Sequence, residues 1–260
     1  MTVPKTITEL IRCSGNNFHA KVARWFAEAG WHVVVSPYYM DQAQNKPREI
    51  DLIVEKRWPV PFSLRAKHGS VVVRLFVECK YIASESVFWL ADKNLVEATA
   101  LVDRNGPFKI DSALMARHHY LSHSPKVAKL FATHKINSAE NEPFYKALNQ
   151  SLSAMVSMRG KQVQIPEMSV TDEVPRELLE FPVVICSSFE NLFSVDFYSE
   201  SEPTRIVDNF QFEVQYAYTD RQSVQQDEYF LLDFVSFERI APFIAAIGQD
   251  AESATNLTQF

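Results

Sequence analysis

The run SVVVRLFVECKYI, residues 70–82, most constrains what this chain can fold into. Its nearly continuous apolar and β-branched character is typical of a strand covered on both faces in the middle of a sheet. Glu78 and Lys80 interrupt the run two positions apart. Because successive strand side chains alternate, both project from one face while Cys79 projects from the other. The run therefore predicts a buried strand that carries two opposite charges on one face.

A second strand is predicted just before this one, over REIDLIVEK, residues 48–56. There Ile50 and Leu52 alternate with Asp51, and if the two strands pair, the Asp51 carboxylate can converge on that of Glu78. A lone charge in a covered strand costs several kcal/mol, so such residues are usually paired or hold a metal. Two carboxylates beside Lys80 therefore predict a divalent-metal site.

Such a site suits phosphodiester hydrolysis. Mg²⁺ prefers oxygen ligands and keeps several waters, so two carboxylates, a main-chain carbonyl and a scissile phosphate could complete its shell. A metal-bound water loses a proton more readily, and the metal offsets charge that develops on the phosphate. Lys80 would either orient or deprotonate the attacking water or stabilise the phosphate as a cation, and the sequence leaves both roles open.

The remaining pattern indicates a mixed α/β chain. A helix is predicted from the Asn pair at 16–17 to Gly30, because apolar residues recur there at helical spacing, and a strand at 32–39 follows it. Residues 40–47 are polar and turn-like, and residues 57–70 indicate an irregular excursion or hairpin. Further helices are predicted at 91–102, 111–121, 126–131 and 143–158.

Beyond Gly160 the pattern changes. A polar connector is expected at 161–180, and three β segments closed by a short helix are expected at 181–198, 209–218 and 228–247, before a frayed tail at 249–260. We expect a core at 1–160 and an acidic, β-rich part at 161–260. This second part would complete the same fold, mediate association as a homodimer, or contact a regulatory partner.

REIDLIVEK followed by VVVRLFVECKYI resembles the PD-(D/E)xK nuclease superfamily, whose signature is an Asp, a variable gap and Glu-x-Lys. Here 26 residues separate Asp51 from Glu78, and AGWHVVV at 29–35 matches the helix ending in Gly-Trp that members carry. The resemblance covers roughly residues 15–160. It implies an α/β, restriction-endonuclease-like core with a central mixed sheet flanked by helices. It also implies that Asp51, Glu78 and the main chain of Cys79 hold Mg²⁺ or Mn²⁺, that Lys80 is catalytic, and that the partner is nucleic acid, chiefly DNA.

The first helix departs from that family. Many members carry a glutamate there, whereas this chain has His19, Ala20 and Lys21 in the corresponding stretch. Three interpretations stay open: His19 takes the place of the acid, the site works with fewer ligands, or catalysis has been lost. The Asp also follows Ile50 where the signature has a proline, a departure that is common in the superfamily.

Charge is divided unevenly along the chain. The net charge is −6, but residues 1–135 hold 19 Lys and Arg against 12 Asp and Glu, and the remainder holds 7 against 20. This split fits either two differently charged surfaces without a partner, or a basic working half that carries an acidic accessory half. Three distant cysteines favour reduced thiols. No stretch approaches a membrane span and the start lacks a signal pattern, so we expect a cytoplasmic protein without membrane association.

Several other residues admit two interpretations. His119 and His123 have a spacing that suits zinc, but no nearby acid completes the pattern, which favours solvated or phosphate-facing histidines beside Arg117. Lys46 and Arg48 would follow a phosphate backbone or lie in a solvated loop. Core packing is favoured for Trp58 and Trp89 over base stacking, and Gln150 is a candidate to approach the metal.

The sequence therefore predicts a hydrolase, a Mg²⁺-dependent endonuclease or exonuclease. The resemblance implies bacterial defence or repair as its setting. One alternative is a catalytically silent nuclease-fold module that binds nucleic acid or a protein. The other is an unrelated protein in which Glu78 and Lys80 form an ordinary ion pair, worth under about 1 kcal/mol at a surface.

Overall fold

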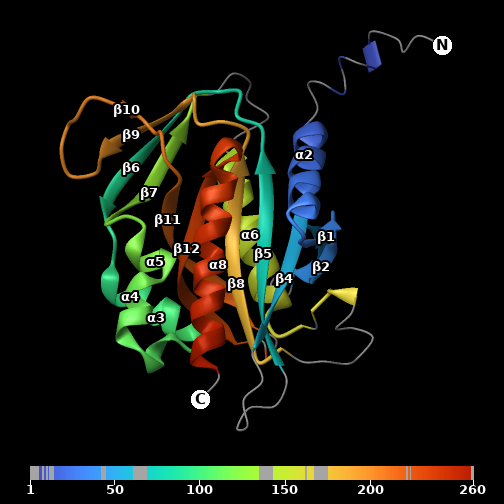
Figure 1. Ribbon diagram of the computed structural model, residues 1–260. Helices are drawn as coiled ribbons and strands as arrows, with labels where there is room; N and C mark the ends of the chain where they lie inside the picture. The colour runs from blue at the N-terminus through green and yellow to red at the C-terminus, as the bar shows by residue number, and fades with distance from the viewer. Residues whose placement is uncertain are drawn as a thin grey trace.

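A ten-stranded mixed sheet forms the centre of the molecule, with helices on both faces (Figure 1). The computed structural model describes residues 15–41, 45–60, 69–134, 143–161, 163–166, 175–220, 222 and 224–258, together with residues 6, 7, 9 and 11. The sheet order is β1-β4-β5-β8-β12-β11-β7-β6-β9-β10, and β2 and β3 form a separate hairpin. The expected α/β class with a central mixed sheet flanked by helices is confirmed at this level.

The strands are β1 (His32–Val35), β2 (Tyr38–Asp41), β3 (Lys46–Glu49), β4 (Leu52–Val60), β5 (Gly69–Lys80), β6 (Ser86–Asp92), β7 (Lys126–Thr133), β8 (Glu177–Cys186), β9 (Leu192–Asp196), β10 (Thr204–Arg205), β11 (Phe210–Thr219) and β12 (Gln225–Ser236). The α-helices are α2 (Gly15–Glu28), α3 (Leu95–Arg104), α4 (Ser112–Arg117), α5 (His119–Ser122), α6 (Pro143–Met158) and α8 (Ile240–Leu257). The short 3-10 helices are η1 (Phe108–Ile110) and η2 (Phe237–Arg239).

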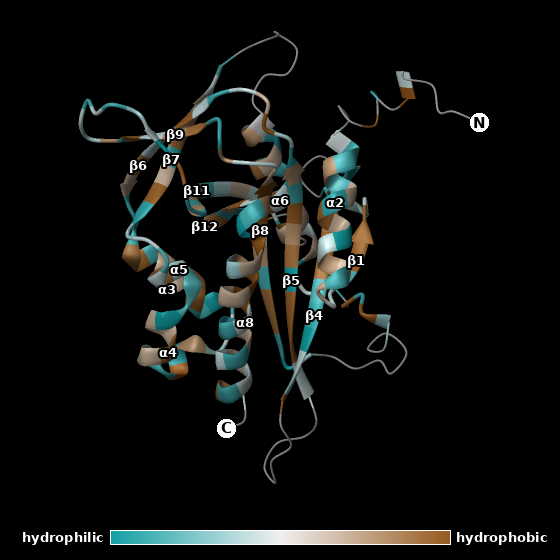
Figure 2. Ribbon diagram, turned by 45° about the horizontal axis from the view of Figure 1, so that its top comes forward, coloured by the Kyte–Doolittle hydropathy of each residue, from teal (hydrophilic) through white to brown (hydrophobic). Residues whose placement is uncertain are grey.

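The apolar run at 70–82 forms the interior strand β5 through Lys80, with a neighbouring strand on each side, as its composition predicts. β5 pairs antiparallel with β4 and parallel with β8, and it is buried from Gly69 to Glu78. Figure 2 shows the hydrophobic colour continuing along β5 and β8, with hydrophilic interruptions in β5. Because both neighbours satisfy its backbone, β5 can hold polar side chains at fixed positions deep in the fold.

The first helix is also confirmed, and it buries Phe18, Val22 and Phe26 on one face. Gly30 ends it with a φ of +75°, a left-handed conformation that glycine adopts without strain. The strand expected at 32–39 is interrupted by Ser36, at a φ of 50°, and continues as β2. The expected turn at 40–47 needs correction at its ends, because Met40 pairs with Pro47 and Asp41 with Lys46 between β2 and β3; residues 42–44 lie outside the described residues.

Three helix predictions in the middle of the chain need correction. Residues 126–131 form strand β7, which pairs with β6 and β11, so the helix predicted there is wrong. A short apolar run suits either structure, and pairing partners decide between them. The helix expected from residue 91 begins at Leu95, capped by Asn94, since residues 91 and 92 end β6. The helix expected at 111–121 is broken at His118 into α4 and α5. The helix at 143–158 is confirmed as α6.

The segment after residue 160 supplies central strands. β8 pairs with β5 and β12 pairs with β8, so strands from both sides of residue 160 share one sheet. β8 begins at Glu177, inside the expected polar connector. The closing helix α8 has 18 residues and buries Ala251, Ala254 and Leu257, so the expectation of a frayed tail at 249–260 is wrong through Leu257. No helix in the described part of the chain has the length and apolar character to cross a membrane.

Different helices cover the two faces of the sheet, with α8 in front and α6 behind in Figure 1. The Ser151 hydroxyl of α6 donates to the Phe76 carbonyl, and Arg74 of β5 donates to Lys161 O just beyond the end of α6. Because alternate residues of β5 share a face, Arg74, Glu78 and Lys80 all project toward the α6 side. α2 and α8 lie on the opposite side, where Phe18 packs against Phe237 next to α8.

Candidate active site

Asp51, Glu78 and Lys80 meet where β4 begins beside the end of β5. The register pairs Leu52 with Val77, so Asp51, one residue earlier, lies across from Glu78. Asp51 Oδ2 accepts a hydrogen bond of 2.7 Å from the Cys79 amide, and the Asp51 amide donates over 3.4 Å to Glu78 Oε1. Lys80 Nζ donates to Glu78 Oε2 over 3.0 Å. The structure thus brings together the two acids and the lysine that the strand pattern selects.

Glu78 is the buried centre of this group. It is 1% exposed, whereas Asp51 is half-buried and the Lys80 side chain is 17% exposed. Burial raises the pKa of Glu78 to about 7, the Lys80 ammonium opposes that rise, and the Asp51 carboxylate adds to it. One lysine therefore offsets only part of the cost of burying this carboxylate, and a second cation would stabilise its ionised form.

The main chain of Cys79 faces the same place. The N–H and C=O of a strand residue point to the same side, so the Cys79 carbonyl is directed, like its amide, toward Asp51 and beyond the last β4–β5 pair. Burial raises the pKa of the Cys79 thiol well above its usual value, which keeps it protonated at neutral pH. The available donors are therefore carboxylate and carbonyl oxygens, a set that fits Mg²⁺ or Mn²⁺.

The first helix brings His19 against the main chain of Asp51. His19 Nε2 lies 2.7 Å from the Asp51 carbonyl oxygen, which also accepts from the Ser36 amide over 2.8 Å. His19 thus contacts the main chain of Asp51. Lys21, in the same stretch of helix, lies 4.1 Å above the Phe237 ring and points away from the acids.

Gln150 of α6 approaches the same strand end. Its Nε2 donates over 3.1 Å to the carbonyl of Glu49, two residues before Asp51, while its Oε1 is buried without a hydrogen-bond partner. Arg48, which precedes Glu49, forms an ion pair of 2.5 Å with Asp41 and is only partly exposed. Lys46 is exposed. Trp58 packs against Trp31 beside the core, as expected, and Trp89 is half-buried.

The histidines beside Arg117 do not behave as the sequence suggests. His119 is buried between two acids that the sequence did not single out, with Nδ1 2.5 Å from Asp250 Oδ2 and Nε2 3.1 Å from Asp233 Oδ2. Burial alone would lower the pKa of His119, but these two carboxylates raise it to about 9. The expectation of a solvated or phosphate-facing His119 is therefore wrong. His123 is exposed and contacts the Asn209 carbonyl.

Ligand atoms of His118, His119 and Asp250 lie within 4.8 Å of one another. Burial lowers the pKa of His118 to about 3, so His118 is neutral beside a charged His119. His119 makes a short hydrogen bond to Asp250 and a second contact to Asp233. We therefore interpret this group as a buried ion cluster. It lies on the α8 side of the sheet, opposite Glu78.

A second buried charge cluster lies on the same face as Glu78. Arg74 Nε donates to Glu55 Oε1 over 2.6 Å, and Nη1 donates to Glu180 Oε1 over 3.1 Å. The Gln164 amide donates to the second oxygen of Glu55 over 2.6 Å. The sequence signal was present, because Arg74 interrupts the same apolar run as Glu78, but its partners come from strands that only the fold brings together.

Comparison with protein-family models, with curated proteins and with solved structures finds no match to this chain.

Proposed function

We propose that this protein is a metal-dependent nuclease with a restriction-endonuclease-like core that hydrolyses phosphodiester bonds in DNA. The observation that carries the proposal is the convergence of Asp51 and Glu78 across two adjacent strands, with Lys80 Nζ 3.0 Å from Glu78 Oε2. The order of an acid, a gap and Glu-x-Lys is the pattern of the PD-(D/E)xK superfamily. Its placement on paired central strands supports the resemblance.

Each residue has a role that its contacts support. Asp51, Glu78 and the Cys79 carbonyl would hold Mg²⁺ or Mn²⁺, which when bound lowers the pKa of a water and offsets charge on the phosphate. Glu78 also holds the Lys80 ammonium, so the lysine stays beside the acids and is partly open to solvent. His19 and the Cys79 amide fix Asp51 from its main chain and its carboxylate respectively.

Plasmid cleavage tests the proposal. Supercoiled plasmid is incubated with the purified protein in Mg²⁺, in Mn²⁺ and in EDTA, and the nicked and linear forms are quantified on gels. Lys80→Ala and Asp51→Asn should each lower the metal-dependent rate by at least about 100-fold. Lys109→Ala, an exposed lysine in η1, is the matched control and should cut as the wild type does. Cutting that persists in EDTA or in Lys80→Ala would contradict the proposal.

A second candidate is a catalytically silent nucleic-acid-binding module. The specific observation in its favour is that His19, not an acid, reaches Asp51 from α2. This candidate predicts that the wild type leaves plasmid intact under every metal condition while it still binds DNA. His19→Glu then tests whether the missing acid is the reason. Metal-dependent nicking by this variant would mean that the other site residues are competent, and no nicking would mean that they are not.

A further inference from the structure

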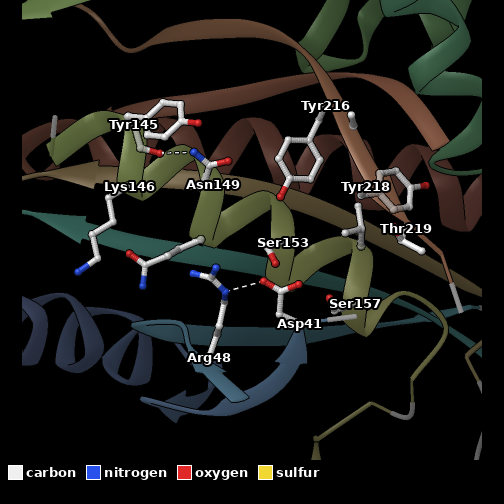
Figure 3. Close-up of a pocket in the computed structure, with 13 residues that line it drawn as sticks. Asp41, Arg48, Tyr145, Lys146, Asn149, Ser153, Ser157, Tyr216, Tyr218 and Thr219 are labelled. Carbon is white, nitrogen blue, oxygen red and sulfur yellow. Dashed lines mark hydrogen bonds and ion pairs between the residues drawn. The ribbon is translucent and has the colours of Figure 1, made fainter. Parts of the chain in front are cut away.

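A cavity of about 430 Å³ lies between α6, the β2–β3 hairpin and the end of β11 (Figure 3). Its volume falls in the range of small-molecule sites. α6 supplies much of the lining, through Lys146, Asn149, Gln150 and Ser153. These positions recur every three or four residues, so they form one polar stripe along the helix. A polar stripe on a helix that packs on a sheet indicates a site for a polar ligand.

The cavity combines cations with aromatic rings. Lys146 is exposed and makes no ion pair within the described residues, whereas Arg48 shares its charge with the largely buried Asp41. Tyr145, 59% exposed, and Tyr216, half-buried, stand on either side of Asn149 in Figure 3. A ligand that suits these groups carries a negative charge for Lys146 and a flat ring for the tyrosines.

Hydrogen-bonding groups in the cavity remain available. The Asn149 Nδ2 donates to the Tyr145 carbonyl over 2.9 Å, which leaves its Oδ1 to accept from a ligand. Gln150 Nε2 donates to the Glu49 carbonyl, which fixes this side chain at the wall of the cavity. The Asn149 amide oxygen, beside aromatic rings, can accept a hydrogen bond from the edge of a nucleobase.

The cavity lies beside the proposed active site. α6 covers the face of the sheet from which Glu78 and Lys80 project, and Gln150 links the cavity to the strand end that holds Asp51. We propose that this cavity binds one unpaired nucleotide of a nucleic-acid single strand, with its phosphate at Lys146 and its base against Tyr145 and Tyr216. This inference rests on the proposed nuclease function, and it identifies the substrate class as single-stranded or locally unpaired nucleic acid. A base that is stacked and paired in a duplex cannot enter such a cavity.

Binding is measured without catalysis, by the fluorescence anisotropy of a fluorescein-labelled single-stranded oligodeoxynucleotide in EDTA. Lys146→Ala should weaken binding about tenfold and reduce by about one the slope of log affinity against log salt concentration. Tyr145→Ala should also weaken binding about tenfold, through lost stacking, while leaving that slope unchanged. Both side chains are exposed, so neither substitution threatens folding.

Matched controls are Lys109→Ala and Tyr198→Ala, which remove an exposed lysine and a 75% exposed tyrosine outside the cavity and should bind as the wild type does. A duplex of the same sequence should bind at least about tenfold more weakly. The inference is overturned if the wild type does not bind the single strand, if both cavity variants bind unchanged, or if the duplex binds equally well. If the protein binds the single strand in EDTA but cleaves neither plasmid nor that single strand in Mg²⁺ or Mn²⁺, the nuclease function alone is overturned. Metal-dependent cleavage together with unchanged binding by both cavity variants would overturn this inference alone.

Discussion

Two buried glutamates on one face of the sheet should respond to the same substitution in opposite directions. Glu78, in β5, and Glu55, in β4, are 1% and 0% exposed. Glu55 is satisfied by Arg74 and by the Gln164 amide, each at 2.6 Å. Glu78 has Lys80 and a long 3.4 Å contact to the Asp51 amide, with the Asp51 carboxylate nearby. Replacing each with Gln removes the charge and keeps the shape.

The expected gain at Glu78 follows from its pKa. Burial raises it from 4.5 to about 7, and each unit of difference corresponds to about 1.4 kcal/mol. Because the folded pKa lies above the unfolded one, the free energy of unfolding falls as pH rises from about 4.5 to 7 and stays lowered above that. At pH 8 Glu78→Gln should therefore be more stable than the wild type by up to about 3 kcal/mol.

The expected loss at Glu55 follows from its partners. Removing one member of a buried ion pair leaves the other charge uncompensated, here Arg74, although Glu180 still contacts it. Such a change costs about 3 kcal/mol. The Gln164 amide would also lose its charged acceptor. Glu55→Gln should thus be less stable than the wild type at pH 8.

Urea unfolding followed by tryptophan fluorescence measures both changes, in EDTA at pH 8 and again at pH 5. The advantage of Glu78→Gln should shrink at pH 5, where wild-type Glu78 is mostly protonated in the folded protein. Adding Mg²⁺ should raise the free energy of unfolding of the wild type but not of Glu78→Gln, since a ligand of the folded state stabilises it by mass action. If Glu78→Gln loses as much stability as Glu55→Gln, Glu78 and Lys80 are a structural ion pair and the reasoning fails.

Three further predictions concern stability. Arg74→Met should cost about 3–5 kcal/mol in urea unfolding by leaving Glu55 and Glu180 unpaired, and adding Glu55→Gln and Glu180→Gln should recover part of the loss. His119, with its pKa raised to about 9, should stabilise the fold below about pH 6.5 and lose that contribution as pH rises to 9. The Tm difference between wild type and His119→Gln should therefore narrow as pH rises from 6.5 to 9. Burial lowers the pKa of Lys93 to about 8, so Lys93 makes stability change with pH in the opposite direction. Both proteins contain Lys93, so its effect cancels in the Tm difference. Leu257→Ala should cost about 2 kcal/mol by circular dichroism melts, whereas exposed Asn256→Ala should change little; equal effects would refute a packed end of α8.

The strand alternation made the candidate site predictable. Residues 78 and 80 share a face in any regular strand, and Asp51 precedes an alternating run, so their convergence needed only that the two strands be neighbours. The helix α2 was equally readable, because its apolar spacing and the glycine that ends it are local signals. Such features depend on a few consecutive residues, so they can be predicted without knowing how the rest of the chain folds.

Features that depend on distant partners were not predictable in the same way. Residues 126–131 form a strand because β6 and β11 flank them, and the local sequence of the segment does not indicate these pairing partners. His119 is buried because Asp233 and Asp250, more than a hundred residues later, surround it. The cavity residues of α6 carry a polar stripe that looks like a solvated helix face until the β2–β3 hairpin and β11 close over it.

The two buried charged residues of β5, Arg74 and Glu78, differ in a way that bears on function. Arg74 is 0% exposed and contacts two carboxylates and a carbonyl, so its charge is matched by groups that the fold itself supplies. Four residues along the same face, Glu78 is as deeply buried, yet its nearest cation is a partly exposed lysine and its second neighbour is another acid. Lys80 therefore offsets only part of the cost of burying Glu78, and the fold leaves this carboxylate short of positive charge. The cation that we propose between Glu78 and Asp51 would supply that charge.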